Sequence, residues 1–527
     1  MTGSTDGLEG FRVLFVYPNF MLTTHAPMSI PVLDKCLRQH GIETRLFDTT
    51  LYRTEATSYD QHKVDTLQMK EFSYGEDGPR LKASDLFEDL RRVAAEFRPN
   101  LLAITIVEPT FPLATRIVQS LRHLHIPTIA GGVFPTLNPE IVLGVDGIDM
   151  VCTGEGEQAL VELCGHMSSG RDPAEIRNLI LKRDGRIVVN GIRPPVNMDG
   201  LPFPDLDMFE RCTLVRAKHG RTYLMVNVEV DRGCPYDCTY CSAPALRRVY
   251  RGAGYQYFRH KSVDQAIAEI RQLCERYRPD YINLCSENIL LRDHQDLCEL
   301  AERYSKEVAL PFWCQTRPET VTEDKVALLR EMGCDNIQVG LEHGNERLRN
   351  ELLRRYCSNA QIVKAGKVIK SAGIRFTTNN IIGLPGETRE LVFDTINLNR
   401  EIGPDSSKVY MFSPYRGTEL HRFCVEKGYI DNSAGFYRFT DGAELRNQPL
   451  SHQEYKGLQR TFNLYVRLPE TLYGRIKVAE RLDRDGDRMF KELRDTYYEV
   501  IFPDAGGPHG AEEVRSDSEL LNRCIKA

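Results

Sequence analysis

The chain has 527 residues, which is too long for one ordinary domain and suggests about three. Its 41% hydrophobic and 27% charged residues are typical of a globular protein. A net charge of −6 gives no reason to expect a nucleic acid as the main partner, and no apolar run approaches the roughly 18 residues that span a bilayer. The polar N-terminus lacks the pattern of a secretory signal, so we expect a cytoplasmic protein with neither a nucleic acid nor a membrane as partner.

The first third of the chain alternates short apolar strands with amphipathic helices. The expected strands are 12–17, 44–48, 101–107, 127–130 and 150–152, with a helix over 114–124. This alternation predicts a doubly wound, Rossmann-like α/β domain over 11–165, in which ligands bind at the carboxyl ends of the strands. The polar, irregular segment 51–86 is interpreted as an insertion.

Two glycine-containing loops follow strands of this domain. The first is Gly131-Gly132-Val133-Phe134-Pro135-Thr136, and the second is Gly154-Glu155-Gly156-Glu157. Glycine at such positions indicates that the backbone comes close to another group or takes a positive φ. Both loops are therefore candidates for ligand contact.

A second alternating series begins at Tyr223. Residues 166–222, rich in proline, are interpreted as a linker with a small hairpin at 179–189. The expected strands that follow are 224–230, 281–284, 312–315, 336–340, 374–380 and 408–412, separated by helices such as 263–277 and 322–332. Six strand–helix units predict a partial (β/α)6, TIM-like barrel over 223–420, with its chemistry at the strand ends. Residues 421–527 are expected to form a mainly helical C-terminal region on the substrate side.

Three of the fifteen cysteines form a cluster directly after a predicted strand, with the spacing Cys-x3-Cys-x2-Cys at Cys234, Cys238 and Cys241. Three thiolates on one loop can hold three irons of a cubane cluster and leave the fourth iron open to a small molecule. A structural zinc site would need a fourth ligand, but the nearest candidates, Cys212 and His219, lie upstream of a predicted strand. The scattered cysteines are interpreted as small buried apolar residues.

This cysteine spacing, with Tyr240 before the last cysteine, resembles the signature of the radical S-adenosylmethionine (SAM) superfamily. The resemblance implies a [4Fe-4S] cluster whose open iron chelates SAM. Reductive cleavage of SAM then gives a 5′-deoxyadenosyl radical that abstracts hydrogen from a substrate, with the electron supplied by an external donor of the flavodoxin or ferredoxin type.

Motifs at successive strand ends extend the resemblance across 223–420. They are Cys285-Ser286-Glu287-Asn288, Gln315-Thr316-Arg317, Gly340-Leu341-Glu342, Ile382-Gly383-Leu384-Pro385-Gly386-Glu387-Thr388 and Pro414-Tyr415-Arg416-Gly417-Thr418. At the second strand relatives often have two glycines before a glutamate, or two aspartates. The SAM-binding residues that the resemblance implies are Tyr240, Ser286, Glu287, Gln315, Arg317, Glu342, Asn380 and Leu384. The alternative for Arg317 and Glu342 is a structural ion pair on the barrel rim.

The two glycine loops, the linker and the domain order resemble the cobalamin-binding domain that precedes many radical SAM domains. The Asp-x-His-x2-Gly motif, whose histidine ligates cobalt in the methionine-synthase type, is absent from the sequence. The resemblance is therefore to the subgroup without a protein histidine on cobalt. It implies cobalamin contacts from Pro18, Thr110, Gly131, Gly132, Val133, Pro135, Gly154, Glu155 and Gly156. The alternative is a flavodoxin-like domain without cobalamin.

The resemblance implies a cobalamin-dependent (class B) radical SAM methyltransferase that methylates an unactivated carbon, or a phosphorus, of a small molecule or peptide. The alternative keeps both cofactors but catalyses an oxidative cyclisation or ring rearrangement. An RNA methylthiotransferase would need three further N-terminal cysteines, and Cys36, Cys152 and Cys164 have the wrong spacing. A non-enzymatic sensor would not need the polar strand-end motifs. No catalytic residue and no substrate follow from the sequence.

Overall fold

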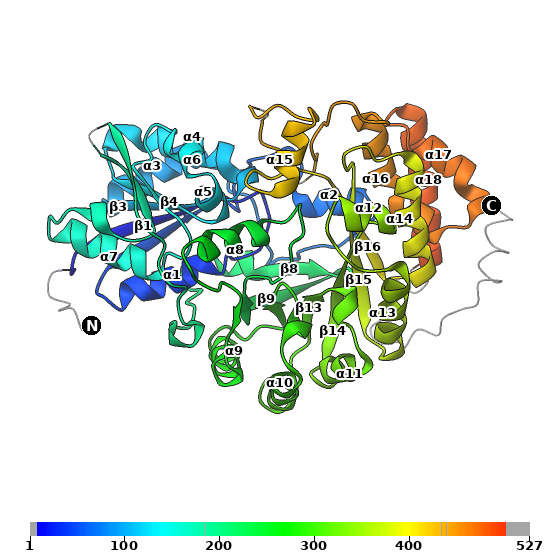
Figure 1. Ribbon diagram of the computed structural model, residues 1–527, viewed down its shortest axis with the longest axis horizontal. Helices are drawn as coiled ribbons and strands as arrows, with labels where there is room; N and C mark the ends of the chain where they lie inside the picture. Colours follow the sequence, from blue (N-terminus) through cyan, green and yellow to red (C-terminus); the bar gives the residue numbers. More distant parts are fainter. Residues whose placement is uncertain (1–7, 184, 434, 439, 502–527) are drawn as a thin grey trace.

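The structure, a computed structural model, describes residues 8–183, 185–433, 435–438 and 440–501 (Figure 1). Two α/β units lie side by side, each built on a seven-stranded sheet. No helix within these ranges is both long enough and apolar enough to cross a membrane. The α/β fold class predicted from the alternation of strands and helices is confirmed.

The first sheet has the order β2-β1-β3-β4-β5-β6-β7. Its strands are β1 (Arg12–Tyr17), β2 (Glu43–Asp48), β3 (Leu101–Thr105), β4 (Thr128–Gly131), β5 (Met150–Cys152), β6 (Leu179–Arg183) and β7 (Arg186–Val189). Neighbours from β2 to β5 pair in parallel, whereas β6 and β7 add antiparallel at one edge. The hairpin expected within the linker is thus part of this sheet.

Helices cover both faces of this sheet because its central strands are apolar throughout. Val13 and Phe15 of β1 pack toward α1 (Ser29–Arg38) and α7 (Glu157–Ser168), while the alternate residue Leu14 packs toward the other face. A strand buried on both faces needs such a continuous apolar run. The helices on that other face are α3 (Leu86–Phe97), α4 (Phe111–Leu121) and α6 (Pro139–Leu143), and α5 (Val133–Leu137) directly follows β4.

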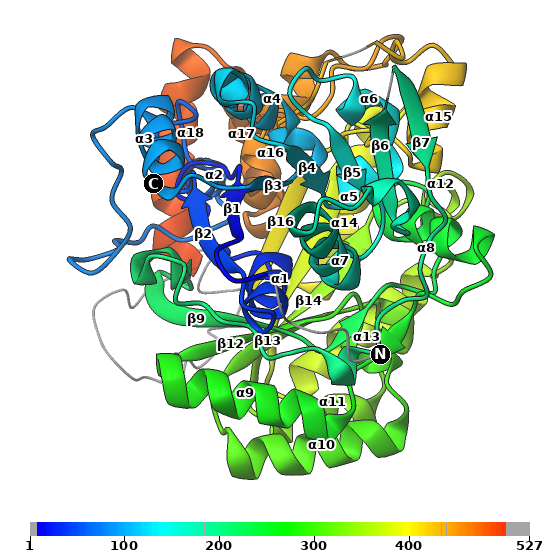
Figure 2. The ribbon, with the colours of Figure 1, turned by 90° about the vertical axis from the view of Figure 1, so that its left-hand side faces the viewer.

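The second sheet has the order β16-β15-β14-β13-β12-β9-β8 and curls into a half-barrel (Figures 1 and 2). Its strands are β8 (Val215–Lys218), β9 (Arg221–Glu229), β12 (Tyr281–Cys285), β13 (Phe312–Thr316), β14 (Cys334–Glu342), β15 (Arg375–Ile382) and β16 (Ser406–Met411). The six strands from β9 to β16 are parallel, as the sequence predicts. The antiparallel edge strand β8 is an addition that the sequence did not predict.

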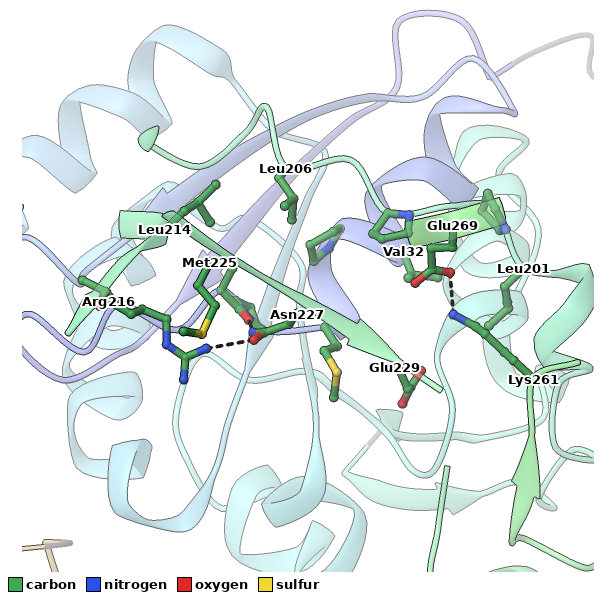
Figure 3. A pocket seen from close by; sticks show the side chains of 17 residues that line it. Val32, Leu201, Leu206, Leu214, Arg216, Met225, Asn227, Glu229, Lys261 and Glu269 are labelled. Atoms are coloured by element: carbon green, nitrogen blue, oxygen red, sulfur yellow. Dashed lines mark hydrogen bonds and ion pairs between the residues drawn. The ribbon is translucent and has the colours of Figure 1, made fainter. Parts of the chain in front are cut away.

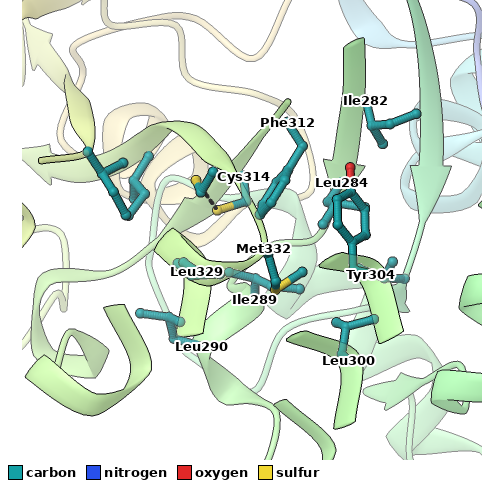
Figure 4. Close-up of a cluster of buried hydrophobic side chains, with 14 of the residues drawn as sticks. Ile282, Leu284, Ile289, Leu290, Leu300, Tyr304, Phe312, Cys314, Leu329 and Met332 are labelled. Atoms are coloured by element: carbon teal, nitrogen blue, oxygen red, sulfur yellow. Dashed lines mark hydrogen bonds between the residues drawn. The ribbon is translucent and has the colours of Figure 1, made fainter. Parts of the chain in front are cut away.

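The convex side of the half-barrel carries a helical layer. Its helices are α9 (Val263–Tyr277), α10 (His294–Glu307), α11 (Glu323–Glu331), α13 (Asn359–Ser371) and α14 (Arg389–Ile402). Figure 4 shows Ile282, Leu284 and Phe312 of the sheet packed against Tyr304 and Met332 in this layer. Because side chains alternate along a strand, the residues between these apolar positions face the concave side. On β12 that residue is Asn283, and on β13 it is Trp313.

The segment 51–86 lies beside β16 and contains a helix, α2 (Tyr59–Asp65), so its interpretation as irregular is wrong in part. Ser58 caps this helix by accepting a hydrogen bond from the backbone N–H of Gln61. The side chain of Gln68 then accepts a hydrogen bond from the backbone N–H of Val409 on β16, at 2.9 Å. The polar sequence of α2 gave no apolar periodicity from which this helix could be predicted.

The described part of the C-terminal region packs on the outer side of β16 and α14. It consists of α16 (His452–Arg467), α17 (Tyr473–Ala479) and α18 (Arg484–Ile501), which follow α15 (Glu419–Glu426). Gln459 and Asn463 of α16 donate hydrogen bonds to the carbonyls of Val409 and Ser407 on β16, at 3.2 and 3.0 Å. Side-chain amides therefore form hydrogen bonds with the backbone groups along the edge of β16 that no other strand pairs with.

Candidate functional site

The predicted cobalamin residues share one edge of the first sheet. Pro18 follows β1, Thr110 lies in the turn after β3, Gly131 ends β4 and is followed by Gly132, Val133 and Pro135, and Gly154, Glu155 and Gly156 follow β5. These strands are parallel neighbours, so their carboxyl ends meet at the same edge. The structure thus brings all nine residues to one side of the domain.

Close packing against neighbouring protein atoms explains two of the glycines in these loops. Gly132 has φ +111°, and a Cβ at this position would lie 2.7 Å from the carbonyl oxygen of Ile106. Gly154 has φ +78°, and a Cβ there would lie 2.5 Å from the hydroxyl of Tyr250. Gly131 is different, because a Cβ at Gly131 would meet nothing nearer than the Cβ of Cys152 at 4.0 Å. A Cβ at Gly156 would also make only ordinary van der Waals contacts, the nearest at 3.5 Å with Leu33, so Gly131 is the glycine of these two loops with the most room beside it.

The β5–α7 loop is joined to the second domain through Arg232. The guanidinium of Arg232 donates hydrogen bonds to Glu155 at 3.0 Å, to Glu157 at 2.8 Å and to Glu229 at 2.7 Å. Arg259 also pairs with Glu155, whose second oxygen accepts the backbone N–H of Val196 at 2.7 Å. The carboxylate of Glu155 is therefore bound within the protein.

A second junction joins the domains after β16. Glu108 accepts hydrogen bonds from the backbone N–H and the guanidinium of Arg416, at 2.7 and 2.6 Å. Both side chains are buried. The carbonyl of Arg416 accepts a hydrogen bond from Asn138, which follows α5, at 3.3 Å. The two junctions hold the ligand edge of the first sheet against the strand ends of the half-barrel.

The three clustered cysteines lie on the loop between β10 (Asp231–Arg232) and α8 (Ser242–Gly252). Cys241 is the N-cap residue of α8, and its sulfur accepts a hydrogen bond from the backbone N–H of Ala243 at 3.4 Å. Arg247 of the same helix donates to the carbonyls of Cys234 and Tyr236, at 2.9 and 3.1 Å. The hydrogen bond from Ala243 lowers the pKa of the Cys241 thiol, but burial outweighs it and raises the pKa overall.

Two arginines converge on Cys238. The guanidinium Nη1 of Arg317 donates to the sulfur of Cys238 at 3.1 Å, and the same guanidinium stacks 3.6 Å from the centre of the Tyr236 ring. Arg355 reaches the same sulfur at 4.0 Å and donates to the carbonyl of Gly340 at 2.6 Å. Both arginines are about 5% exposed, so their charges act on the sulfur through little solvent.

Glu342 joins the cysteine loop to the end of β14. Its carboxylate lies 3.8 Å from Arg355, and Tyr240 of the cysteine loop is close enough to influence its pKa. Burial raises the pKa of Glu342, and Arg355 and Tyr240 act in the opposite direction. Its backbone takes φ +66°, which is uncommon for a residue with a Cβ. Residues held in this region are often found at functional sites.

The predicted SAM residues of β12 and β13 lie near the same loop. The pKa of the Cys241 thiol is raised to about 12. Burial is the largest cause, and the nearby carboxylate of Glu287 is the second. Gln315 donates to the carbonyl of Ser286 at 3.5 Å, and Ser286 accepts the backbone N–H of Asn288 at 3.0 Å. The polar residues at the ends of these two strands are thus linked to one another.

The structure does not bring Asn380 to this group. Its side chain bonds to Asn399 of α14 at 2.8 Å and to the carbonyl of Lys408 at 2.9 Å, on the helix-covered face of β15. Since strand side chains alternate, the neighbouring Asn379 faces the concave side instead. Leu384 packs in an apolar cluster with Leu353 and Phe412, against which Tyr240 also packs.

The three thiols of the cysteine loop are not gathered around one point in the described structure. Among the described residues, no group of three or more His, Cys, Asp or Glu side chains is gathered closely enough to hold one metal ion. A cubane bonds each thiolate to a different iron, so its ligands lie farther apart than those around one zinc ion. The thiols nevertheless influence one another. Cys238 and Cys234 both raise the pKa of Cys241, although their effects are smaller than those of burial and of Glu287.

Several residues of this site lie outside what the sequence indicated. Arg355 follows a short helix and belongs to no motif, and Tyr250 contacts the β5–α7 loop from α8 by accepting the backbone N–H of Glu155 at 2.8 Å. Glu108 and Arg232 form the interdomain junctions. The signal that could have identified Arg232 is its position two residues before Cys234, the first cysteine of the motif.

Comparisons with known proteins agree with this arrangement. Residues 22–164 match the model of the B12 binding domain, and residues 228–398 match that of the radical SAM superfamily. Among solved structures, the chain is similar to the radical SAM methyltransferase TsrM of Kitasatospora setae, with a TM-score of 0.60, 18% identity, and coverage of 80% of this chain and 76% of that one. It is also similar to the cobalamin-dependent SAM radical enzyme OxsB, with a TM-score of 0.63, 14% identity, and coverage of 94% and 72%. These likenesses show the fold.

Three curated relatives extend the comparison. An uncharacterized methyltransferase, PH0819, of Pyrococcus horikoshii is 27% identical over 66% of this chain and 74% of its own length. The anaerobic magnesium-protoporphyrin IX monomethyl ester cyclase of Rubrivivax gelatinosus is 24% identical over 65% of this chain and 62% of its own length. The cytidylyl-2-hydroxyethylphosphonate methyltransferase of Streptomyces wedmorensis is 24% identical over 83% of this chain and 86% of its own length.

Proposed function

We propose that this chain, which belongs to the cobalamin-dependent radical SAM enzymes, is a methyltransferase acting on an unactivated carbon, or a phosphorus, of a small molecule or peptide. One observation carries the proposal. Arg232 bonds the β5–α7 loop of the B12-binding domain and lies two residues before Cys234. The loop that would hold cobalamin and the loop that would hold the cluster are therefore fixed to the same side chain. Two of the curated relatives are named methyltransferases.

The [4Fe-4S] cluster, SAM and cobalamin together supply reductive radical chemistry and a methyl donor. We assign Cys234, Cys238 and Cys241 as the cluster ligands. The guanidinium groups of Arg317 and Arg355 lie beside the sulfur of Cys238, and a hydrogen bond to a ligand sulfur is one of the ways a protein sets a cluster potential. We further assign Glu287, Gln315 and Glu342 to SAM, with Asn379 in place of Asn380 on the concave face.

For cobalamin we assign the backbone of the loops after β1, β3, β4 and β5, with Gly131 as the point of closest approach. The side chain of Glu155 has a different part, because its ion pairs hold the two domains together. The electron would come from a small reduced protein of the flavodoxin or ferredoxin type. The two interdomain junctions hold the cobalamin loops and the cysteine loop in place relative to one another, and a site closed to water protects radical chemistry from side reactions.

The experiment that tests the proposal is product analysis of SAM turnover by the anaerobically reconstituted enzyme. Methyl transfer converts one SAM to S-adenosylhomocysteine for each SAM cleaved to 5′-deoxyadenosine and methionine. The second candidate, a cyclase or ring-rearranging enzyme, is favoured by the similarity to the Rubrivivax gelatinosus cyclase. It would form 5′-deoxyadenosine and methionine without S-adenosylhomocysteine.

A further inference from the structure

A fully buried pair of polar side chains, His343 and Glu387, joins the segments that follow β14 and β15. Nε2 of His343 lies 2.8 Å from the carboxylate of Glu387, and neither side chain has any exposed surface. His343 directly follows Glu342 at the end of β14, and Glu387 lies in the turn between β15 and α14. We call this pair the β14–β15 clamp.

The hydrogen bonds of His343 determine which ring nitrogen carries the proton. Nδ1 accepts the backbone N–H of Asn345 at 3.0 Å, so this nitrogen has no proton of its own. The proton of the neutral ring is therefore on Nε2, which donates it to the carboxylate of Glu387. The bond at one nitrogen thus makes the other nitrogen a donor with a fixed direction.

Glu387 extends this contact to the backbone after β15. One of its oxygens accepts from His343, and the other accepts the backbone N–H groups of Gly383 and Leu384, at 2.5 and 3.1 Å. Hydrogen bonds to a charged acceptor are stronger than those between neutral groups, so this carboxylate fixes the turn firmly. Removing the ring would leave a buried carboxylate oxygen without its donor, which is costly.

Contacts with α14 and with Arg349 hold the backbone of the segment after β14. The backbone N–H of Gly344 donates to the hydroxyl of Thr395 on α14 at 2.9 Å, and a Cβ at Gly344 would collide with the carbonyl group of Asp394. The carbonyl of His343 accepts a hydrogen bond from the buried Arg349 at 2.6 Å. Because its backbone is held in this way, the ring of His343 can impose a position on Glu387.

Both ends of the β14–β15 clamp adjoin residues of the SAM site. Glu342, which we assign to SAM, directly precedes His343 and has φ +66°, a conformation that persists only where the surroundings hold it. Leu384, which the sequence predicts to contact SAM, donates its backbone N–H to Glu387. Leu384 also belongs to the apolar cluster against which Tyr240 of the cysteine loop packs. The clamp therefore fixes two neighbouring strand ends of the site together.

We propose that His343 is a positioning residue of the SAM site, which acts through Glu387 to hold the ends of β14 and β15 in the arrangement that binds SAM. This inference rests on the proposed function and adds to it a buried residue that does not itself contact SAM. Its effect depends on the hydrogen bond that Nε2 donates. Glutamine can place an amide donor near this position, whereas asparagine keeps an acceptor for Asn345 but is too short to reach Glu387.

The test measures two quantities on anaerobically purified protein that contains its cluster. Calorimetric titration gives the dissociation constant of SAM, and hydrogen–deuterium exchange without SAM reports on the amides of Gly383 and Leu384. We expect His343→Asn to bind SAM at least tenfold more weakly and to exchange these amides at least tenfold faster. His343→Gln should stay within threefold of wild type in both quantities.

Glu269→Gln is the matched control. Glu269 of α9 forms another buried ion pair, with Lys261 (Figure 3). Since α9 packs against β9, toward the other edge of the same sheet, this variant should lose stability but keep the SAM affinity and amide exchange of wild type. An equal loss of SAM affinity in Glu269→Gln and His343→Asn would overturn the inference, because general destabilisation would then explain both.

Two further results would also overturn it. One is wild-type SAM affinity in His343→Asn, and the other is equally weak binding by His343→Gln and His343→Asn. Glu387→Gln breaks the pair from its other side and should match His343→Asn, so the test does not depend on one variant that folds. Absence of S-adenosylhomocysteine from wild-type turnover would refute the proposed function alone, because neither SAM affinity nor amide exchange requires methyl transfer.

Discussion

The guanidinium of Arg317 lies 3.1 Å from the sulfur of Cys238, although the two residues are 79 positions apart in the chain. Arg317 sits at the end of β13 and Cys238 on the loop before α8. The aromatic ring of Tyr236 holds the guanidinium in place from the other side. A strand end of the half-barrel thus reaches directly to the sulfur of a proposed cluster ligand.

Replacing Arg317 with Ala should make the reduction potential of the cluster more negative and slow SAM cleavage by at least tenfold. The reason is that the Cys238 sulfur loses a charged hydrogen-bond donor. A redox titration followed by electron paramagnetic resonance measures the potential. Arg317→Lys should recover part of the shift. An unchanged potential, cleavage rate and KM for SAM would support the structural ion pair with Glu319, which lies 2.5 Å from Arg317.

Replacing Cys234, Cys238 and Cys241 together with Ala should remove the roughly four irons per chain expected for a cubane, and with them the broad visible absorbance and all SAM cleavage. Iron analysis and absorbance spectroscopy of anaerobically purified protein measure the effect. Cys274→Ala, a half-buried cysteine on α9, is the control and should keep its iron. Zinc in the wild type, with the same absorbance in the triple variant, would contradict the assignment.

Gly131→Ala should weaken cobalamin binding at least tenfold without lowering stability, because the added Cβ meets no protein atom closer than 4.0 Å. Gly132→Val should also lose cobalamin, but with a loss of stability, because its Cβ would meet the carbonyl of Ile106 at 2.7 Å. Cobalamin content, iron content and thermal midpoint are measured together. Normal cobalamin binding by Gly131→Ala would show that the corrin does not approach this loop.

The junction at Arg232 should contribute strongly to stability. Glu155→Gln leaves Arg232 and Arg259 with one negative charge fewer in a buried position, and we expect a loss of roughly 3 kcal/mol in the free energy of unfolding. Glu162→Gln breaks a more exposed pair with Arg193 on the same domain and should cost less than about 1 kcal/mol. Urea unfolding, followed by circular dichroism, measures the free energy of unfolding of both variants. Equal losses would mean that the junction at Arg232 contributes no more to stability than an exposed ion pair.

Lys408 should make stability depend on pH. Its pKa is about 7 in the folded protein, against a usual value of 10.5, so the unfolded chain binds the proton more tightly. The destabilisation is absent above about pH 10.5 and grows as the pH falls toward 7, with Lys63, Lys218, Arg216 and Asp60 as the charged neighbours. Wild type should therefore lose stability relative to Lys408→Met over this range, as measured by urea unfolding. If the free energies of unfolding of wild type and Lys408→Met changed with pH in the same way, the Lys408 ammonium would be exposed to solvent.

The strands were predictable because parallel, doubly covered strands are short apolar runs between turn residues. The helix expected at 263–277 matches α9 closely, since its apolar residues recur at helical spacing. By contrast β8 has the polar sequence Val-Arg-Ala-Lys, and α2 is held by tertiary contacts that no local pattern encodes.

The sequence predicted the site residues at the strand ends, but it did not predict the contacts that join distant segments of the site. Motifs indicated Arg317 and Glu342, but Arg355 reaches the site from a segment without any motif. The choice of Asn380 over Asn379 depended on strand phase, which a sequence of mostly apolar and amide residues leaves open. The roles of Glu155 and Glu108 required both domains to be placed together.

The edge of β16 is occupied by side-chain amides from Gln68, Gln459 and Asn463 rather than by another strand. No further strand can pair with this edge, so the half-barrel stays open. The segment 51–86, which belongs to the preceding domain, covers part of its edge. Changes in length or sequence within 51–86 would then alter what covers this edge of the sheet, at a distance in sequence from the cysteine loop. Substrate range in such an architecture can diversify at a place remote from the residues that carry the radical chemistry.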